Sequence, residues 1–177
     1  WTGGRPPAGG GGFAADPDCV IRITGGVVRI DADGDGIDSN GSFEVDGGET
    51  YITGPTHSAN GAVDYMGTGR ITGGIFAAAG SAGMAQNFDD SSTQGAILYS
   101  SQEWLPAGTK ATLSDAEGNQ LVSYVPAKTY QTILVSAPGI EAGQTYTLSV
   151  GSDPVVIEMT GLLYGNGGGM PGGMPGG

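Results

Sequence analysis

The chain is poor in the residues that most enzymes use for chemistry, with one histidine and one cysteine among 177 residues. Neither a Ser/His/Asp triad nor a zinc cluster can be assembled from that supply. His57 lies in an insertion beside Pro55 and is interpreted as a solvated loop residue rather than a ligand. Cys19 has no partner for an internal disulfide, so it is either a small buried residue or an assembly candidate through an intermolecular bridge.

Basic residues are also scarce. Six Lys and Arg stand against 18 Asp and Glu, which gives a net charge of −12. Such a chain is a poor partner for nucleic acid and for anionic membranes. No apolar run approaches the roughly 18 residues of a membrane span. No signal peptide is recognisable, and the start at Trp1 looks internal or processed.

Glycine and β-forming residues dominate what is present. The chain has 36 glycines, many Val, Ile, Thr and Tyr residues, and few helix formers. This composition predicts an all-β protein with many turns. We expect four parts: a Gly/Pro-rich arm (1–18), a repeat region (19–95), an antiparallel β region (96–164) and a Gly-Gly-Met-Pro tail (165–177).

The repeat region is marked by Gly-Gly pairs at 25–26, 47–48 and 73–74, spaced by 22 and 26 residues. Apolar residues stand at matching positions around the pairs, for example Ile23, Val45 and Ile71. Short strands that recur every 20-odd residues predict a short right-handed parallel β-helix of about three coils. In this register Arg22, Glu44 and Arg70 form a charge ladder, and Arg29 lies beside Tyr51.

An acidic stretch at residues 30–41 interrupts the first repeat. It holds four aspartates, Asp31, Asp33, Asp35 and Asp38. Carboxylates at this density repel one another, so the loop is costly without a cation. Hard oxygen ligands favour calcium over zinc. The start matches an EF-hand loop, but Ser42 stands where the closing Glu belongs and the flanks predict strands. The alternative is a solvated Asp/Gly turn.

The repeat alignment extends this acidic site. Asp38, Asp64 and Gln86 occupy equivalent positions in successive repeats and are expected to form a polar ladder at one corner. Asp33, Asp35 and Asn60 are close enough in sequence to complete a calcium site there.

After Gly95 the repeat ends and ordinary strand patterns follow. Residues 110–114 and 120–124 flank a turn at 115–119, which predicts a hairpin. Further strands are expected at 96–99, 132–136, 145–150 and 155–159. We expect this region to cover one end of the β-helix, whose bare edge would otherwise invite aggregation.

Several motifs together resemble a secreted family of cellulolytic anaerobes: 23–26, 34–41, 45–48, 52–55, 60–65, 83–86 and 123–130. The resemblance covers about residues 20–150. It implies a calcium-containing parallel β-helix with a pectate-lyase-like fold that binds cellulose and acidic sugars such as polygalacturonate. By analogy Asp33, Asp35, Asp38 and Asp64 become metal-ligand candidates. Family members carry more repeats upstream than this chain does.

Three functions compete at this point. The first is a non-catalytic, calcium-dependent extracellular carbohydrate-binding protein, in which calcium bridges the acidic protein and an anionic polysaccharide. The second is a structural subunit of an extracellular fibre or matrix, a homo-oligomer or filament assembled through its Gly-rich ends. The third is a pectate-lyase-like enzyme. We expect no enzyme activity, because the arginines already have structural explanations.

Overall fold

The computed structural model describes residues 14–165, and these form an all-β structure with no helix. No helix in this part of the chain is therefore long and apolar enough to cross a membrane. The predicted arm and tail lie largely outside the described residues. The sheets are mixed, with parallel pairing among the first eight strands and mainly antiparallel pairing afterwards.

Three sets of parallel strands, with five pairings between them, follow the repeat. One sheet has the order β1 (Val20–Ile23), β4 (Ser42–Val45) and β7 (Gly69–Ile71). A second contains β3 (Ile37–Ser39) and β6 (Val63–Tyr65). The third set is β2 (Val27–Asp31), β5 (Glu49–Thr53) and β8 (Ile75–Gly80).

The register of these pairings matches the sequence alignment. Val28 pairs with Thr50 and Thr50 with Phe76, as the Gly-Gly spacing predicts. The second glycine of each pair, at positions 26, 48 and 74, has a φ of 77°, 80° and 88°. Glycine adopts this left-handed conformation without steric cost, which lets each repeat turn the same corner.

The β2–β5–β8 set continues into a six-stranded sheet. Its order is β15-β9-β12-β8-β5-β2, and β12 pairs antiparallel with both β8 and β9. The added strands are β9 (Ala96–Leu105), β12 (Tyr130–Ser136) and β15 (Leu163–Tyr164). One sheet thus contains strands from both the repeat region and the region after residue 95.

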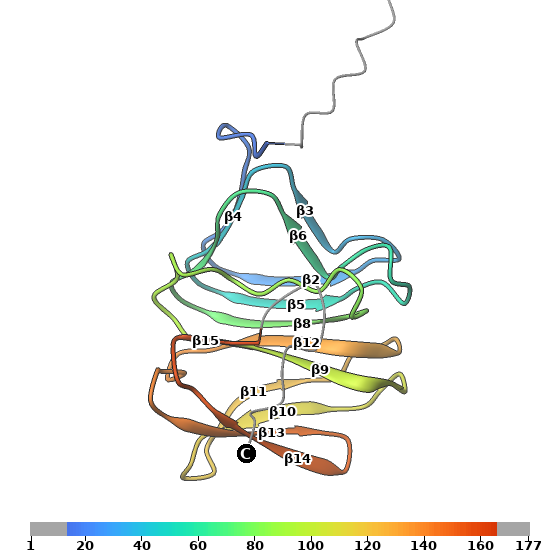
Figure 1. Ribbon diagram of the computed structural model, residues 1–177, viewed down its shortest axis with the longest axis vertical. Helices are drawn as coiled ribbons and strands as arrows, with labels where there is room; N and C mark the ends of the chain where they lie inside the picture. The colour runs from blue at the N-terminus through green and yellow to red at the C-terminus, as the bar shows by residue number, and fades with distance from the viewer. Residues whose placement is uncertain (1–13, 166–177) are drawn as a thin grey trace, which may run out of the picture.

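A four-stranded antiparallel sheet packs below, in the order β11-β10-β13-β14. Its strands are β10 (Ala111–Ser114), β11 (Gln120–Tyr124), β13 (Thr145–Val150) and β14 (Asp153–Glu158). β10 and β11 form the predicted hairpin. Figure 1 shows three levels: the β3–β6 and β4 strands at the top, the six-stranded sheet in the middle, and this sheet at the bottom.

Two apolar cores lie on opposite faces of the six-stranded sheet. Phe43, Ile52 and Phe76 belong to the core on the repeat side, where all three are fully buried. Ile133, Leu113 and Tyr146 belong to the core shared with the four-stranded sheet. Alternate residues of β8 serve the two cores, with Ala78 in the first and Ala77 in the second, as the two-residue period of a strand requires.

The last repeat is covered on its far side. β12 pairs with β8, and the N–H groups of Asp89 and Thr93 donate to the carbonyls of Gly69 and Ile71 in β7. The Ile71 N–H donates in turn to the Ser92 hydroxyl at 3.1 Å. The predicted cover over one end of the repeats is therefore present, and a loop supplies part of it.

Candidate functional site

The acidic loop connects β2 to β3, and the register brings two of its predicted members together. Asp38 and Asp64 are direct partners in the β3–β6 pair. Loss of hydration on burial raises the pKa of Asp64, and the negative charges of Asp35 and Asp38 raise it further. Three of the predicted calcium ligands therefore share one electrostatic environment.

Gln86 lies beside this corner but performs a different task. Its side-chain oxygen accepts from the Tyr65 N–H at 3.1 Å, and its side-chain nitrogen donates to the Tyr65 carbonyl at 3.2 Å. The amide thus pairs with the outer edge of β6 as a neighbouring strand would. Gln86 is opposite Tyr65 rather than Asp64, because the described residues contribute no third strand beside β6.

Asp35 and Asn60 connect the loop to the next repeat. The Gly61 N–H donates to Asp35 Oδ1 at 2.7 Å, and the Gly36 N–H donates to the Gly61 carbonyl at 3.3 Å. The Asn60 carbonyl accepts from the Ser81 hydroxyl at 2.9 Å. These hydrogen bonds hold the loop against the residues that precede β6. One of the two Asp35 carboxylate oxygens is engaged in them.

Asp33 has an unpredicted partner. Lys128 Nζ lies 2.7 Å from Asp33 Oδ1 and 2.6 Å from Asp31 Oδ1, and it donates to the Ala32 carbonyl at 3.1 Å. The hydrogen bond to Lys128 and its positive charge lower the pKa of Asp33. The pairing was not predictable from local sequence because 95 residues separate the two side chains.

The donor set can be compared with the needs of calcium. Within residues 14–165 no group of three or more His, Cys, Asp or Glu side chains is arranged to hold a metal ion. Asp35, Asp38 and Asp64 still offer hard oxygen donors in one region, while Asp33 is engaged by Lys128. The residues suit calcium in kind, and ligation would require them to draw closer.

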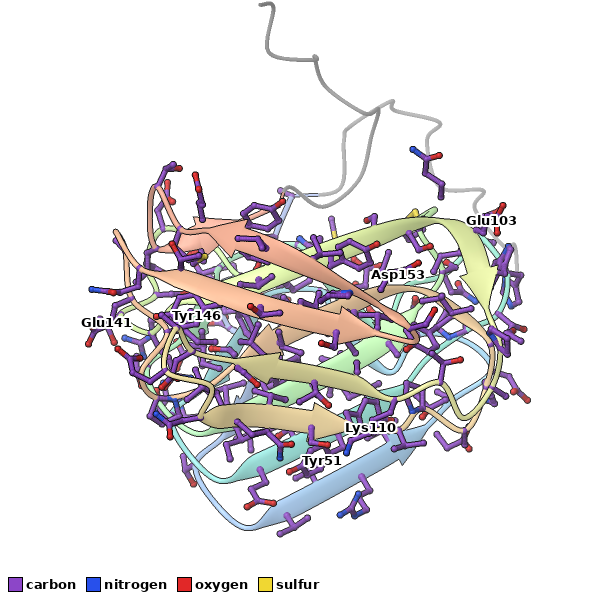
Figure 2. All side chains as sticks on the ribbon, turned by 90° about the horizontal axis from the view of Figure 1, so that it is seen from below. Tyr51, Glu103, Lys110, Glu141, Tyr146 and Asp153 are labelled. Atoms are coloured by element: carbon purple, nitrogen blue, oxygen red, sulfur yellow. The ribbon has the colours of Figure 1, made fainter. Side chains whose placement is uncertain are left out.

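Next to the acidic loop lies a cleft of about 240 Å³ that sequence analysis did not predict. It forms where the four-stranded sheet ends and leaves the outer face of β2 and β5 uncovered; in Figure 2 β2 is the blue strand at the lower edge. The lining residues are Arg29, Ile30, Asp31, Tyr51, Thr53, Tyr124, Val125 and Ala127.

Two tyrosines and an arginine organise this cleft, which we call the tyrosine cleft. Arg29 Cζ is 4.8 Å from the centre of the Tyr51 ring, as the register predicted. Tyr51 stacks on Tyr124 with ring centres 5.6 Å apart. The Tyr124 hydroxyl shares a 2.5 Å hydrogen bond with Thr53 Oγ1. Burial raises the pKa of both tyrosines, so both hydroxyls stay protonated at neutral pH.

A second cleft of about 230 Å³, which we call the acidic cleft, lies at the hairpin turn. Asp115, Glu117 and Glu141 contribute three carboxylates, and Tyr146 lies beside Glu141 in Figure 2. The Tyr146 hydroxyl donates to the Gly139 carbonyl at 2.6 Å and accepts from the Glu141 N–H at 2.8 Å. Among residues 14–165, no cationic side chain lines this cleft.

The predicted charge ladder is confirmed on the β1–β4–β7 sheet. Glu44 Oε2 lies 2.5 Å from Arg22 and 3.3 Å from Arg70. Asp46 lies 3.9 Å from each arginine and adds a second carboxylate. Both arginines therefore have carboxylate partners in the sheet.

Cys19 is a free, partly exposed thiol just before β1. A hydrogen bond with Asp16, reinforced by desolvation and the nearby carboxylates, raises the pKa of the thiol. The thiolate is thus disfavoured, and the environment does not activate this cysteine as a nucleophile.

Comparison with protein-family models, with curated proteins and with solved structures gave no match to this chain. The resemblance to secreted β-helix proteins therefore stays a prediction from the motifs.

Proposed function

We propose that this chain is a non-catalytic extracellular carbohydrate-binding protein built on a short right-handed parallel β-helix. The β-helix interpretation is supported by five parallel pairings with offsets of 22 or 26 residues. The equivalent positive φ of Gly26, Gly48 and Gly74 also supports it. Repeats of this kind present a broad flat side on which a polysaccharide can lie.

The tyrosine cleft is the observation that carries the proposal. It joins a guanidinium, a carboxylate and tyrosine surface in about 240 Å³. This volume is below the ~300 Å³ at which pockets for drug-sized ligands begin, so it suits one sugar unit of a longer chain. Arg29 would pair with the carboxylate of an acidic sugar, while Asp31 would accept from its hydroxyls.

Calcium is proposed at the neighbouring corner, held by Asp35, Asp38 and Asp64 with help from Asn60. A bound cation would relieve the repulsion that raises the pKa of Asp64. It would also lower the negative potential that a chain of net charge −12 presents to an anionic polysaccharide.

The non-catalytic part of the proposal is supported by the contacts of the cations. Arg22 and Arg70 pair with Glu44, and Lys128 pairs with Asp31 and Asp33. A lyase needs a basic group free to abstract a proton from the sugar. These three side chains are engaged in ion pairs instead, whereas Arg29 lies over the Tyr51 ring and is assigned here to the carboxylate of the sugar.

Isothermal titration calorimetry with trigalacturonate and with cellotriose, each in calcium and in EDTA, tests the function. We expect trigalacturonate to bind with a one-to-one stoichiometry, and more tightly in calcium. Absence of heat with both sugars in both buffers would refute carbohydrate binding. Equal affinity in calcium and in EDTA would refute only the calcium part.

A further inference from the structure

The first repeat has an exposed strand edge at β2, whereas the corresponding strand of the last repeat, β8, is paired on both sides. Among residues 14–165 no strand pairs with the outer edge of β2, whereas the far edge of β8 is covered by β12. Val27 is 62% exposed, the largest value among the apolar residues of the repeats. Ile30 is only partly buried, although its register partner Ile52 is fully buried. The core on the repeat side is therefore open at Ile30, and the exposed Val27 lies on the opposite face of the same strand.

The backbone of β2 is arranged to pair again. The Glu49 N–H donates to the Gly26 carbonyl at 2.8 Å, and the Ala32 N–H donates to the Thr53 carbonyl at 2.9 Å. In a parallel ladder alternate residues direct both backbone groups to the same neighbour. Even-numbered residues of β2 thus face β5, and Val27, Arg29 and Asp31 turn their N–H and C=O groups to the outer edge.

The side chains at the same edge are self-complementary. Arg29 and Asp31 are both exposed and lie two residues apart on one face of β2. If two copies of β2 run antiparallel with Ile30 opposite Ile30, each Arg29 faces an Asp31. This register pairs odd residues with odd residues, as the outward backbone groups require. Shifting it by one residue pair places Arg29 opposite Arg29.

We propose that two copies of this chain pair through the outer edges of β2, antiparallel and centred on Ile30. The contact is isologous, since the same edge serves in both copies. It covers the open end of the core with Ile30 of the other copy and pairs the outward N–H and C=O groups of Arg29 and Asp31 in both strands. The two-fold axis is perpendicular to the sheet, so the two tyrosine clefts lie on one face of the joined sheet.

Charge reversal gives a sharp test by analytical ultracentrifugation of the full chain. The wild type is expected to be a dimer. Arg29→Asp and Asp31→Arg each oppose like charges at both symmetry-related pairs, so each alone should raise the dimer dissociation constant about tenfold or more. Mixing the two variants restores complementary pairs, and a heterodimer should form. Circular dichroism checks that both variants fold.

Asp31→Arg also removes a carboxylate that Lys128 contacts within the same chain. The mixture controls for this internal loss, because the loss persists in the mixture while the charge pairs between copies are restored. A monomeric wild type at about 100 μM, which would make any dimer weak, or a mixture that stays as monomeric as its parts, would overturn the proposal.

Hydrogen exchange of the wild type gives a second readout that needs no variant. We expect the amides of Arg29 and Asp31 to become protected as the protein concentration rises through the dimer range. Protection of these amides that is independent of concentration would instead mean that the chain covers its own edge, and would contradict pairing between copies.

Discussion

The tyrosine cleft and the acidic cleft have nearly the same size, about 240 and 230 Å³, and opposite chemistry. The first has Arg29 against Tyr51 and a single carboxylate, Asp31. The second has three carboxylates and, in the part of the chain that the structure describes, no cation. Volume alone would rank them as equals, so the nature of the lining groups must decide which one receives an acidic sugar.

The hydrogen bonding within the two clefts sharpens the contrast. In the acidic cleft Asp115 accepts hydrogen bonds from the Asn119 side chain and from the N–H groups of Asn119 and Glu117. The Asp115 carboxylate is therefore engaged in holding its own turn together. In the tyrosine cleft the Arg29 guanidinium lies over a ring, and within residues 14–165 of a single copy no carboxylate forms an ion pair with it. A cation without a carboxylate partner is free to receive an anionic ligand.

The largest effect is expected from Arg29→Met. Loss of a charge-assisted hydrogen bond should weaken trigalacturonate binding by about tenfold or more, measured by calorimetry. Glu141→Gln in the acidic cleft is the matched control and should leave the affinity unchanged. The comparison fails if the two variants bind alike. Arg29 also lies at the β2 edge, so Arg29→Met could change dimer formation as well as sugar binding. The two variants are therefore titrated at a concentration where they sediment identically.

Removal of a tyrosine hydroxyl separates stability from binding. Tyr124→Phe breaks the hydrogen bond to Thr53 and should lower the free energy of unfolding by about 1 kcal/mol, measured by urea denaturation. It should also weaken sugar binding. Tyr146→Phe should cost a similar or larger free energy, since it leaves the Gly139 and Glu141 backbone groups without their partner, yet leave binding intact. Equal losses of binding in both variants would indicate a general loss of structure.

Lys128→Met should lower the melting temperature slightly, with a defined pH dependence. The pKa of Asp33 is lowered in the folded chain, so its contribution is present above the unfolded value of about 3.9 and is lost as pH falls through the folded pKa. The pKa of Lys128 is raised, so its contribution is lost as pH rises through a value above about 10.4. Thermal melts should therefore differ most between about pH 4 and 10, and converge only as pH falls below or rises above that range. A constant difference at every pH would exclude the ion pairs as its cause.

The smallest effects are expected from replacing two carboxylates, and the two replacements should change the free energy of unfolding in opposite directions. Asp64 has a raised pKa, so its charge costs stability once pH exceeds the unfolded value. In EDTA at pH 7, Asp64→Asn should raise the free energy of unfolding by less than about 1 kcal/mol and remove any stabilisation by calcium. Asp115→Asn should instead destabilise slightly, because hydrogen bonds from Asn119 lower the pKa of Asp115. Destabilisation by Asp64→Asn in EDTA would contradict the repulsion described above.

The repeat register was predictable because glycine pairs fix the corners and the strands between them are short. That is why the Arg22–Glu44 pairing and the Asp38–Asp64 pairing followed from spacing alone. Burial was less predictable: Ile30 and Ile52 occupy equivalent positions, but only Ile52 has a repeat on each side. Sequence periodicity identifies the face of a strand and not its neighbours.

The site was predictable only in part. The acidic loop is visible as a run of aspartates, but Lys128 reaches Asp33 from 95 residues away. Tyr124 reaches Tyr51 through the packing of one sheet on another, which no local pattern encodes. Gln86 was placed at the right corner, but its amide pairs with the backbone of Tyr65, because no third strand from residues 14–165 lies beside β6.

Mapping the bound sugar by nuclear magnetic resonance tests the central claim most directly. Labelled protein in calcium would be titrated with trigalacturonate while amide and side-chain shifts are followed. The largest shift changes are expected to cluster at Arg29, Tyr51, Thr53 and Val125, with none at Glu117 or Glu141. Changes concentrated at the acidic cleft, or no saturable change at any residue, would contradict this claim.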